Sequence, residues 1–230
     1  MKFSEIIHHF IGIFYPNICE VCGQNLMKGE NTICLSCLQK MPRTGLHNEK
    51  NNLLEQRFWG KTEIERATAF YYFTKKSKFQ KLLHKLKYKD GKEIGAVLGK
   101  YAAAEIVENE DFNNFDCIVP VPLHPNKLRK RGYNQSLCIA QGLAEILRAE
   151  IDDENLVRVI ENPTQTKKSA YERWENTKGI FAVKNAQLFE NKRILLVDDV
   201  LTTGSTLIAC AEAIHEVCNA KISIFTLAAA

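Results

Sequence analysis

The hydrophobic and polar positions of this chain follow two periods, one typical of helices and one typical of buried strands. Residues 64–73 (IERATAFYYF) are aromatic and partly alternating, and residues 116–122 (DCIVPVP) form a short apolar run that prolines end. Both segments predict strands. Residues 78–89, 93–108 and 134–149 instead repeat apolar side chains at the helical period, which predicts helices.

The last third of the chain continues this alternation. Residues 191–200 predict a strand, residues 204–218 a helix and residues 220–227 a final strand. Residues 152–178 are polar and carry no strong period. Alternating strands and helices favour a parallel sheet with helices on both faces, so we expect an α/β fold.

The beginning of the chain has a different organisation. Within residues 1–16, apolar side chains share one face of an expected amphipathic helix, at Phe3, Ile6, Ile7, Phe10, Ile11 and Phe14. A cysteine-rich segment follows, and the polar residues 43–60 are predicted to form a linker. We therefore expect an N-terminal helix and cysteine module at 1–42, and a main domain at 61–230.

Composition agrees with a soluble globular protein. The chain has 230 residues, 45% of them apolar and 25% charged, which is enough for one domain and a small module. We expect no membrane-spanning helix, because no uncharged apolar stretch of about 18 residues occurs. Glu5, His8 and His9 interrupt the apolar N-terminus and no cleavage site follows, which argues against a signal peptide. We expect a cytoplasmic protein, and the net charge of +4 points only weakly to an anionic ligand.

Four cysteines near the N-terminus have the spacing of a metal site. Cys19 and Cys22 form one C-x2-C pair, Cys34 and Cys37 form a second, and eleven residues separate the two pairs. Four thiolates suit tetrahedral Zn²⁺ in a closed structural site, with no open position for a substrate. The alternative is a pair of redox-active C-x-x-C motifs. The four scattered cysteines are expected to be small buried apolar residues.

Residues 194–206, ILLVDDVLTTGST, carry the main chemical signal. An apolar strand runs into Asp198 and Asp199, and hydroxyls around Gly204 lead into a helix. The carboxyl end of such a strand is where open α/β sheets bind ligands, and the free amides of a helix N-terminus attract phosphate. Carboxylates accept hydrogen bonds from vicinal ribose hydroxyls, so the pattern predicts a sugar-phosphate site. The alternative is a helix N-cap beside surface aspartates.

This segment closely resembles the phosphoribosyl-pyrophosphate (PRPP) signature of type I phosphoribosyltransferases at all 13 positions. By that resemblance, Asp198 and Asp199 hold the ribose hydroxyls and are the candidate catalytic residues. The loop that wraps the 5′-phosphate comprises Leu201, Thr202, Thr203, Gly204, Ser205 and Thr206.

Three further stretches, together with the cysteine module, resemble the ComF family of phosphoribosyltransferase-like competence proteins. They are LHKLKYKDGKEIG at 83–95, VPVPLHPNKLRKRGYNQS at 119–136 and QTKKSAYERWENTKGIF at 165–181. The resemblance weakens around 43–60, and Lys168, Thr177 and Ile180 depart from it. The expected fold is thus a type I phosphoribosyltransferase-like sheet preceded by a zinc-ribbon-like module.

The resemblance also selects two basic phosphate-binding candidates. Lys127, Arg129, Lys130 and Arg131 form a cation cluster that can neutralise pyrophosphate, and the recurring R-G-Y-N-Q part favours Arg131, Asn134 and Gln135. Arg173, with Gln165 and Asn176, lies on an expected mobile loop that can close over a ligand. The alternatives are a solvated basic turn and a purely structural tether.

Two functions remain open from the sequence. The first is phosphoribosyl transfer from PRPP to an unidentified acceptor, with Mg²⁺ on the diphosphate. The second is a non-catalytic adaptor that binds a nucleotide or single-stranded DNA. The resemblance to the family implies a DNA-uptake helicase as its partner. Residues 75–92 contain eight lysines and one aspartate among aromatic residues, which is typical either of single-stranded nucleic-acid contact or of an ordinary core face.

Overall fold

A computed structural model describes residues 17–88, 91–160 and 179–230. The expected helix within 1–16 and the predicted site residues Gln165, Arg173 and Asn176 lie outside the described residues. The described helices include none that is long and apolar enough to cross a membrane.

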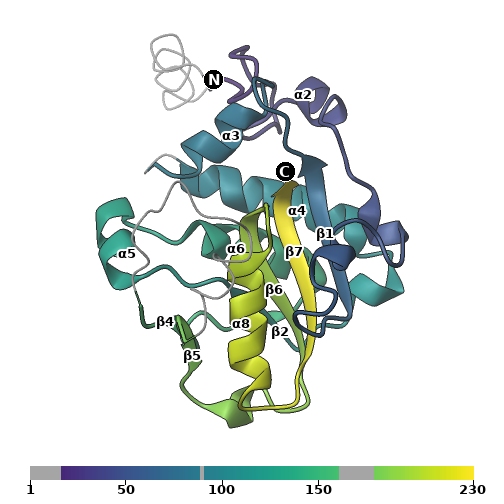
Figure 1. Cartoon of the computed structure of the whole chain (residues 1–230). Coiled ribbons are helices and arrows are strands. Elements are labelled where there is room, and N and C mark those ends of the chain that lie inside the picture. The colour runs from purple at the N-terminus through teal and green to yellow at the C-terminus, as the bar shows by residue number, and fades with distance from the viewer. Residues whose placement is uncertain (1–16, 89–90, 161–178) are drawn as a thin grey trace.

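Five parallel strands form the central sheet, in the order β1-β7-β6-β2-β3 (Figure 1). Their bounds are β1 Arg66–Tyr72, β2 Cys117–Pro120, β3 Glu150–Ile151, β6 Arg193–Leu201 and β7 Lys221–Ala229. A separate antiparallel pair consists of β4 Leu156–Arg158 and β5 Phe181–Val183. The predicted α/β fold with a parallel sheet is confirmed.

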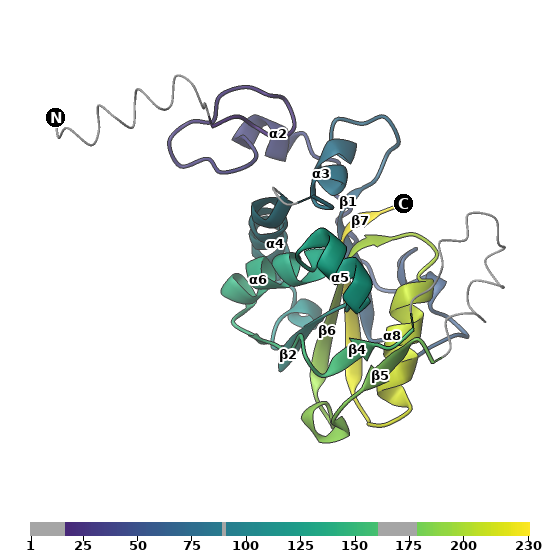
Figure 2. The same cartoon turned by 90° about the vertical axis from the view of Figure 1, so that its left-hand side faces the viewer.

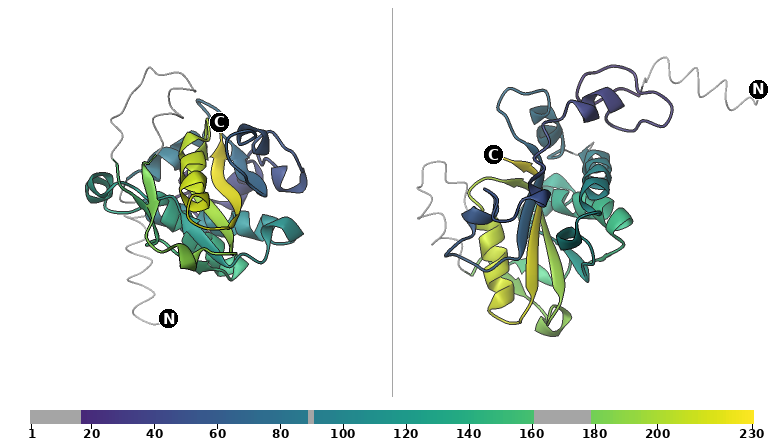
Figure 3. Two further views of the ribbon diagram at one scale, coloured as in Figure 1. Left: turned by 60° about the horizontal axis from the view of Figure 1, so that its bottom comes forward. Right: turned by 90° about the vertical axis from the view of Figure 1, so that its right-hand side faces the viewer.

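Helices cover both faces of this sheet, as Figures 2 and 3 show. One face carries α4 Lys92–Ile106 and α6 Gln135–Leu147, and the other carries α8 Ser205–His215. The remaining helices are α2 Leu35–Gln39, α3 Gln80–Lys85 and α5 Pro125–Arg131, with 3-10 turns η1 Leu46–Asn48, η2 Glu55–Arg57, η4 Glu110–Phe112 and η5 Ala186–Leu188. The predicted helix at 78–89 is shorter than expected, and α5 contains the basic cluster, for which no helix was predicted.

Strand β6 shows how the apolar sequence builds two cores. Leu195 and Val197 pack into the core beneath α4 and α6, whereas Ile194 and Leu196 pack into the core beneath α8. Successive strand residues point to opposite faces, so an unbroken apolar run is what a strand buried on both faces needs.

Helices α4 and α6 pack in unusually close contact. A Cβ added at Gly142 of α6 would lie 2.0 Å from the carbonyl oxygen of Ala96 in α4. Only glycine fits at this crossing, which lets α6 lie directly against α4.

The cysteine module packs on the main domain beside α3 (Figure 2). Val21, Ile33 and Leu38 belong to the same apolar core as Leu82 and Leu86. Lys85 of α3 also forms an ion pair with Glu20 of the module. The module is therefore joined to the main domain by a shared core.

Residues 43–60, predicted as a linker, contribute to the second core. Leu46, Leu54 and Phe58 are buried there, and the segment contains η1 and η2. Glu55 forms a buried ion pair with Arg66 of β1, with Nε and Oε1 separated by 2.7 Å. The domain boundaries themselves stay a prediction.

Candidate functional site

The site lies where the strand order of the sheet reverses. The chain leaves β2 through α5 and α6 and returns in β3 at one edge, but it leaves β6 through α8 and returns in β7 on the other side. Neighbouring strands whose connections diverge in this way open a crevice at their carboxyl ends, which is where α/β sheets bind ligands. Asp198 and Asp199 lie at this end of β6.

The two aspartates are half-buried, and two donors hold the carboxylate of Asp198. Asp198 Oδ1 accepts a hydrogen bond of 3.0 Å from Ser136 Oγ and another of 2.9 Å from the backbone N–H of Asp199. Ser136 lies in the first turn of α6, so the helix packed on the sheet orients this carboxylate. Sequence reasoning missed Ser136, although it lies in the quoted stretch 119–136.

The environment of Asp198 disfavours its charged form. Burial raises the pKa of this carboxyl, and the neighbouring charge of Asp199 raises it further, to about 7, although Ser136, the Asp199 amide and the more distant Arg158 act in the opposite direction. A group that titrates near neutrality responds strongly to an added ligand or cation. The charge state of Asp198 is therefore sensitive to what binds in the crevice.

The loop after the pair has the geometry of an anion site. Gly204 has a φ of +80°, a conformation that favours glycine, and it precedes α8. The amide of Ile208 bonds to Gly204, so the earlier amides of α8 are the ones free of helical partners. Thr203 Oγ1 and Ser205 Oγ lie 2.9 Å apart, which adds hydroxyl donors beside those amides.

The predicted loop residues therefore lie together. Leu201 is buried, Thr202 is exposed, and Thr203, Ser205 and Thr206 are half-buried.

The segment from 55 to 58 packs against this loop and is linked to its start by hydrogen bonds. A Cβ at Gly204 would contact the ring of Phe58 at 3.6 Å, and Phe58 is fully buried. Arg57 Nη2 donates to the Ala230 carbonyl at 2.9 Å, and the Ala230 amide donates to the Leu201 carbonyl at 2.9 Å. The turn η2 thus positions the start of the loop.

Two buried polar groups near the crevice lack hydrogen-bond partners within the described part of the chain. They are the hydroxyl of Tyr71 and Nε2 of Gln135, which precedes Ser136. Burial and then the charge of Asp199 raise the pKa of Tyr71, so this hydroxyl stays protonated and can donate. An unpaired buried polar group costs about 1–3 kcal/mol, which a polar ligand or water can recover.

The basic candidates fall on α5, which follows the exit of β2. Lys127 and Arg131 are both half-buried, and their spacing of four residues places them on one face of α5. Arg129 donates to Asn126 at 2.7 Å. The Asn134 side chain accepts from the Ser136 amide at 3.1 Å and donates to the Val121 carbonyl at 3.0 Å. Asn134 therefore joins α6 to the loop after β2. The other basic candidate, Arg173, lies outside the described residues.

The four N-terminal cysteines converge on one point. The Sγ atoms of Cys19, Cys22, Cys34 and Cys37 all lie within 4.8 Å of one another. Gly23 has a φ of +75° directly after the first pair, as the turn requires. The amide of Cys34 donates to Cys19 Sγ at 3.3 Å. Burial raises the pKa of Cys19, but this bond and those from the amides of Cys22 and Val21 outweigh it and lower the pKa to about 7. Four thiols that converge on one point fit a structural Zn²⁺.

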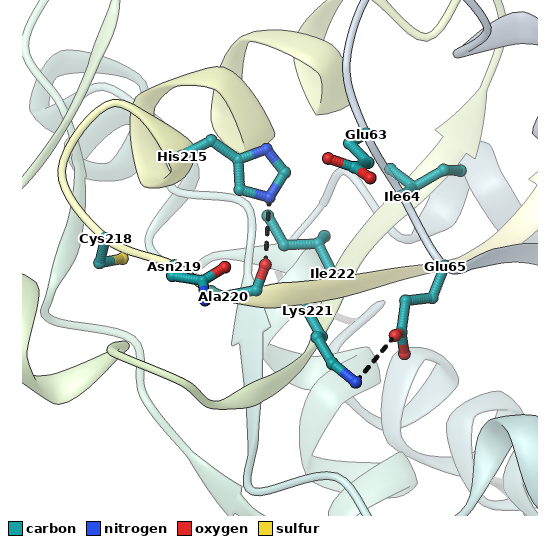
Figure 4. Close-up of a pocket in the computed structure, with 9 residues that line it drawn as sticks. All are labelled: Glu63, Ile64, Glu65, His215, Cys218, Asn219, Ala220, Lys221 and Ile222. Carbon is teal, nitrogen blue, oxygen red and sulfur yellow. Dashed lines mark hydrogen bonds and ion pairs between the residues drawn. The ribbon is translucent and has the colours of Figure 1, made fainter.

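A separate cavity lies at the other end of the sheet (Figure 4). It has a volume of about 560 Å³ and is lined by Glu63, Ile64, Glu65, His215, Cys218, Asn219, Ala220, Lys221 and Ile222. Lys221 pairs with Glu65 at 3.7 Å, and His215 Nε2 lies 3.2 Å from the Ala220 carbonyl oxygen. These residues surround the amino ends of β1 and β7, away from the crevice.

Comparison with known proteins assigns the larger part of the chain to one family. Residues 86–230 match the family model described as the phosphoribosyl transferase domain. The chain is 28% identical over 213 residues to the DNA utilization protein YhgH of Escherichia coli strain K12, covering 91% of this chain and 89% of that protein. It is 34% identical over 116 residues to Competence protein F of Haemophilus influenzae, covering 50% and 51% of the two chains. It is 38% identical over 111 residues to Competence protein ComFC of Bacillus subtilis, covering 48% and 43%.

The matches among solved structures share less sequence with this chain. A hypoxanthine phosphoribosyltransferase from Staphylococcus aureus is 16% identical, with a TM-score of 0.36 and coverage of 59% of this chain and 62% of that one. The glutamine PRPP amidotransferase from B. subtilis is 18% identical, with a TM-score of 0.42 and coverage of 63% and 30%.

Proposed function

Because the chain belongs to the phosphoribosyl transferase domain family and has competence proteins among its relatives, we propose that its crevice binds a 5-phosphorylated ribose. The ligand is PRPP or a ribonucleotide 5′-phosphate. One observation carries the proposal. The half-buried Asp198–Asp199 pair and the amide-rich loop Leu201–Thr206 are consecutive at the carboxyl end of β6. In this arrangement the carboxylates can accept hydrogen bonds from the ribose hydroxyls while the adjacent loop binds the 5′-phosphate.

The donor set also fits Mg²⁺ brought in with a diphosphate. Mg²⁺ prefers oxygen ligands, and it binds through one or two carboxylates together with phosphate oxygens. Asp198 and Asp199 supply such oxygens at the crevice. When bound, the ion neutralises part of the diphosphate charge.

Transfer of the phosphoribosyl group is the reaction that this arrangement favours. A nitrogen of the acceptor would form a bond to C1 of the ribose and lose its proton, while the bond from C1 to the pyrophosphate oxygen breaks and its electron pair leaves with pyrophosphate. The loop holds the 5′-phosphate still, and the negative charge of Asp198 and Asp199 favours the positive charge that develops on the ribose. Positioning and charge stabilisation are sufficient for this chemistry, without a covalent nucleophile.

The direct test is calorimetric titration of the full chain with PRPP in the presence of Mg²⁺. Replacing Asp198 and Asp199 together by asparagine should abolish binding. The matched control converts two exposed carboxylates after α4, Glu108 and Glu110, to glutamine and should leave binding unchanged. Survival of PRPP binding in the first double variant would remove the site assignment, and pyrophosphate release with added bases tests transfer separately.

A second candidate function is contact with single-stranded nucleic acid along α3. Lys75, Lys76, Lys78, Lys81, Lys85 and Lys87 are all exposed. Of the neighbouring aromatic residues, Tyr71 is buried, but Tyr88 is 59% and Tyr72 41% exposed. Exposed rings beside lysines suit base stacking and phosphate contact. The affinity for a single-stranded oligonucleotide should fall steeply with salt, and a flat dependence would contradict this function.

The relatives' names concern competence and DNA utilization, and we extend that role to this chain as a proposal, with a DNA-uptake helicase as the partner. The eight cysteines all lie in the described residues, and no two of them form a disulfide bond. Free thiols are typical of the reducing cytoplasm, where we place the protein.

A further inference from the structure

The lysine-rich segment 75–87 begins beside the phosphate loop. The amide of Phe73, directly after β1, donates to the Ala229 carbonyl at 2.6 Å. The neighbouring Ala230 amide donates at 2.9 Å to the carbonyl of Leu201, the first residue of that loop. Figures 1 and 2 both place α3, which continues the segment, at the end of the sheet where β7 finishes. The lysines and the crevice therefore share one end of the molecule.

The start of α3 is held next to the strand that carries the acidic pair. The ring of Phe79, the N-cap residue of α3, lies 6.4 Å from the ring of Tyr71 in β1. Tyr71 pairs in the sheet with Ala228 of β7, which in turn pairs with Val200, the residue after Asp199. One row of the sheet thus runs from the start of α3 to the acidic pair.

The other end of α3 is held on the far side of that pair. The hydroxyl of Tyr133 donates to the Leu86 carbonyl at 2.6 Å. Tyr133 precedes Asn134, the N-cap of α6, and the first turn of α6 contains Ser136, which bonds to Asp198. Because its two ends are held in this way, α3 lies across the carboxyl end of the sheet.

The exposed side of α3 carries free cations and a pair of rings. Lys85 forms an ion pair with Glu20. Within the described part of the chain, no ion pair engages the other exposed lysines, which are Lys75, Lys76, Lys78, Lys81 and Lys87. The rings of His84 and Tyr88 lie 5.1 Å apart, and both side chains are exposed. Such a surface suits the phosphates and bases of a single strand.

The chemistry of the crevice decides which end of a strand fits. Asp198 and Asp199 can accept hydrogen bonds from sugar hydroxyls, and the adjacent loop suits a 5′-phosphate. In a nucleic acid, only the 3′-terminal nucleotide combines a free 3′-hydroxyl with a 5′-phosphate that continues into the strand. Every other nucleotide would bring a 3′-phosphate against the two carboxylates, which like charges disfavour. Thr202 is exposed, so the strand can leave the loop on that side.

We propose that the crevice and the lysine-rich segment bind one ligand, a single-stranded nucleic acid whose 3′-terminal nucleotide occupies the crevice and whose preceding phosphates contact the lysines. The inference rests on the proposed function, because the terminal nucleotide takes the place of the ribonucleotide 5′-phosphate. A free ribonucleotide and a 3′ end therefore exclude each other. A terminal ribose offers two vicinal hydroxyls and a deoxyribose only one, so the ribose end binds more tightly.

Fluorescence anisotropy of 5′-labelled single-stranded oligonucleotides tests this proposal on the full chain. The oligonucleotides share one sequence and end in a deoxyribose 3′-hydroxyl, a ribose 2′,3′-diol or a 3′-phosphate. Mg²⁺ is left out of the buffer, because it would bridge a 3′-phosphate to the carboxylates. We expect the hydroxyl ends to bind roughly tenfold or more tightly than the phosphate end, and the diol to bind most tightly. Excess AMP should abolish this advantage.

Variants separate the contributions of the two surfaces. The asparagine double variant of the acidic pair should remove the difference between the ends. Lys75→Gln combined with Lys78→Gln should weaken binding of all three oligonucleotides equally and reduce its salt dependence. The matched control is Lys100→Gln combined with Lys192→Gln, two exposed lysines elsewhere in the domain, and it should change neither property.

The outcomes also separate this inference from the proposed function. If the three ends bind equally, or if the preference survives in the variant of the acidic pair, the inference is wrong, whereas calorimetric binding of PRPP still supports the proposed function. If the control lysines have the same effect as those of the segment, the segment has no part in the site and the inference again fails. If the hydroxyl ends are preferred but PRPP with Mg²⁺ does not bind, transfer from PRPP is excluded and the strand-end site remains.

Discussion

Ser136 Oγ donates a hydrogen bond of 3.0 Å to Asp198 Oδ1 and so joins the start of α6 to the end of β6. Ser136 is only 4% exposed, so this bond is shielded from water. The same oxygen of Asp198 accepts the Asp199 amide, which fixes the orientation of the carboxylate. Helix α6 itself is held by its close packing on α4 at Gly142. The position of the acidic pair thus depends on a helix that precedes it by about 60 residues.

Ser136→Ala should weaken PRPP binding and displace its pH dependence. The hydroxyl stabilises the charged form of Asp198, so its loss raises the pKa of this carboxyl above about 7. Calorimetric PRPP titrations between pH 6 and 9 should show the midpoint of the affinity profile move to higher pH. Ser223→Ala, another buried serine of the domain, is the control, and an equal displacement there would contradict the role given to Ser136.

Asp198 should also make the folded chain less stable as the pH rises, which is the opposite of the usual contribution of an aspartate. Burial and Asp199 raise its pKa to about 7, so between about pH 4 and pH 7 the folded chain keeps a proton that the unfolded chain has released. This contribution to the free energy of unfolding is therefore lost as the pH rises through about 7. Asp198→Asn removes the titration, so the variant should be more stable than the natural chain at pH 8 and equally stable near pH 4. Urea unfolding at both pH values measures the difference, and a constant difference would refute it.

The sequence predicted the strand and the acidic pair of this site better than the residues from other segments that pack around them. The run Ile194–Val197 and the following aspartates indicated a buried strand and its ligand-binding end, because both are encoded by adjacent residues. Ser136, Tyr71 and Phe58 were missed, because each reaches the site only through tertiary packing from a distant segment. Polarity suggested a linker at 43–60, where spaced apolar residues such as Leu54 and Phe58 in fact enter a core. Asn134 matched a ligand motif, but both the oxygen and the nitrogen of its side-chain amide form hydrogen bonds within the protein.

Arg57→Gln should weaken phosphate binding without a large loss of stability. Arg57 bonds to the Ala230 carbonyl, and Ala230 in turn bonds to Leu201 at the start of the phosphate loop. Loss of one such bond costs roughly 0.5–1.5 kcal/mol. If this cost falls entirely on ordering the phosphate loop, the affinity for PRPP should fall roughly two- to tenfold. Titration with PRPP, together with the melting temperature, separates the two effects. Gln56→Ala, in the same turn but bonded to Asn51, should change neither, and a matching loss of affinity there would contradict the prediction.

The cysteine cluster should contain one zinc ion per chain. Zinc binds thiolates, and the four converging Sγ atoms can supply a complete tetrahedral ligand set. Cys22→Ser should remove the metal, because Cys22 Sγ lies 3.8 Å from Cys34 Sγ within the cluster. The melting temperature should fall as well, since Val21 and Ile33 share a core with α3. Elemental analysis by plasma mass spectrometry measures the content, and Cys218→Ser should keep the full complement. Zinc retained by Cys22→Ser would show that the four thiols do not act together.

The buried ion pair between Arg66 and Glu55 gives the most specific stability prediction. Arg66 is 6% and Glu55 5% exposed, and Arg66 also donates to the carbonyls of His47 and Glu49. Arg66→Met leaves Glu55 charged and unpaired in the core, which typically costs about 3–5 kcal/mol. Changing Glu55 to Gln as well removes the unpaired charge, so the double variant should be more stable than Arg66→Met alone. Lys50→Ala removes only a rim charge 3.7 Å from Asp111 and should cost less than about 1 kcal/mol. Urea unfolding gives all three values. A double variant no more stable than Arg66→Met would mean that the loss comes from the other contacts of Arg66, which are its ion pair with Asp111 and its bonds to the carbonyls of His47 and Glu49. The unpaired charge of Glu55 would then not be the cause.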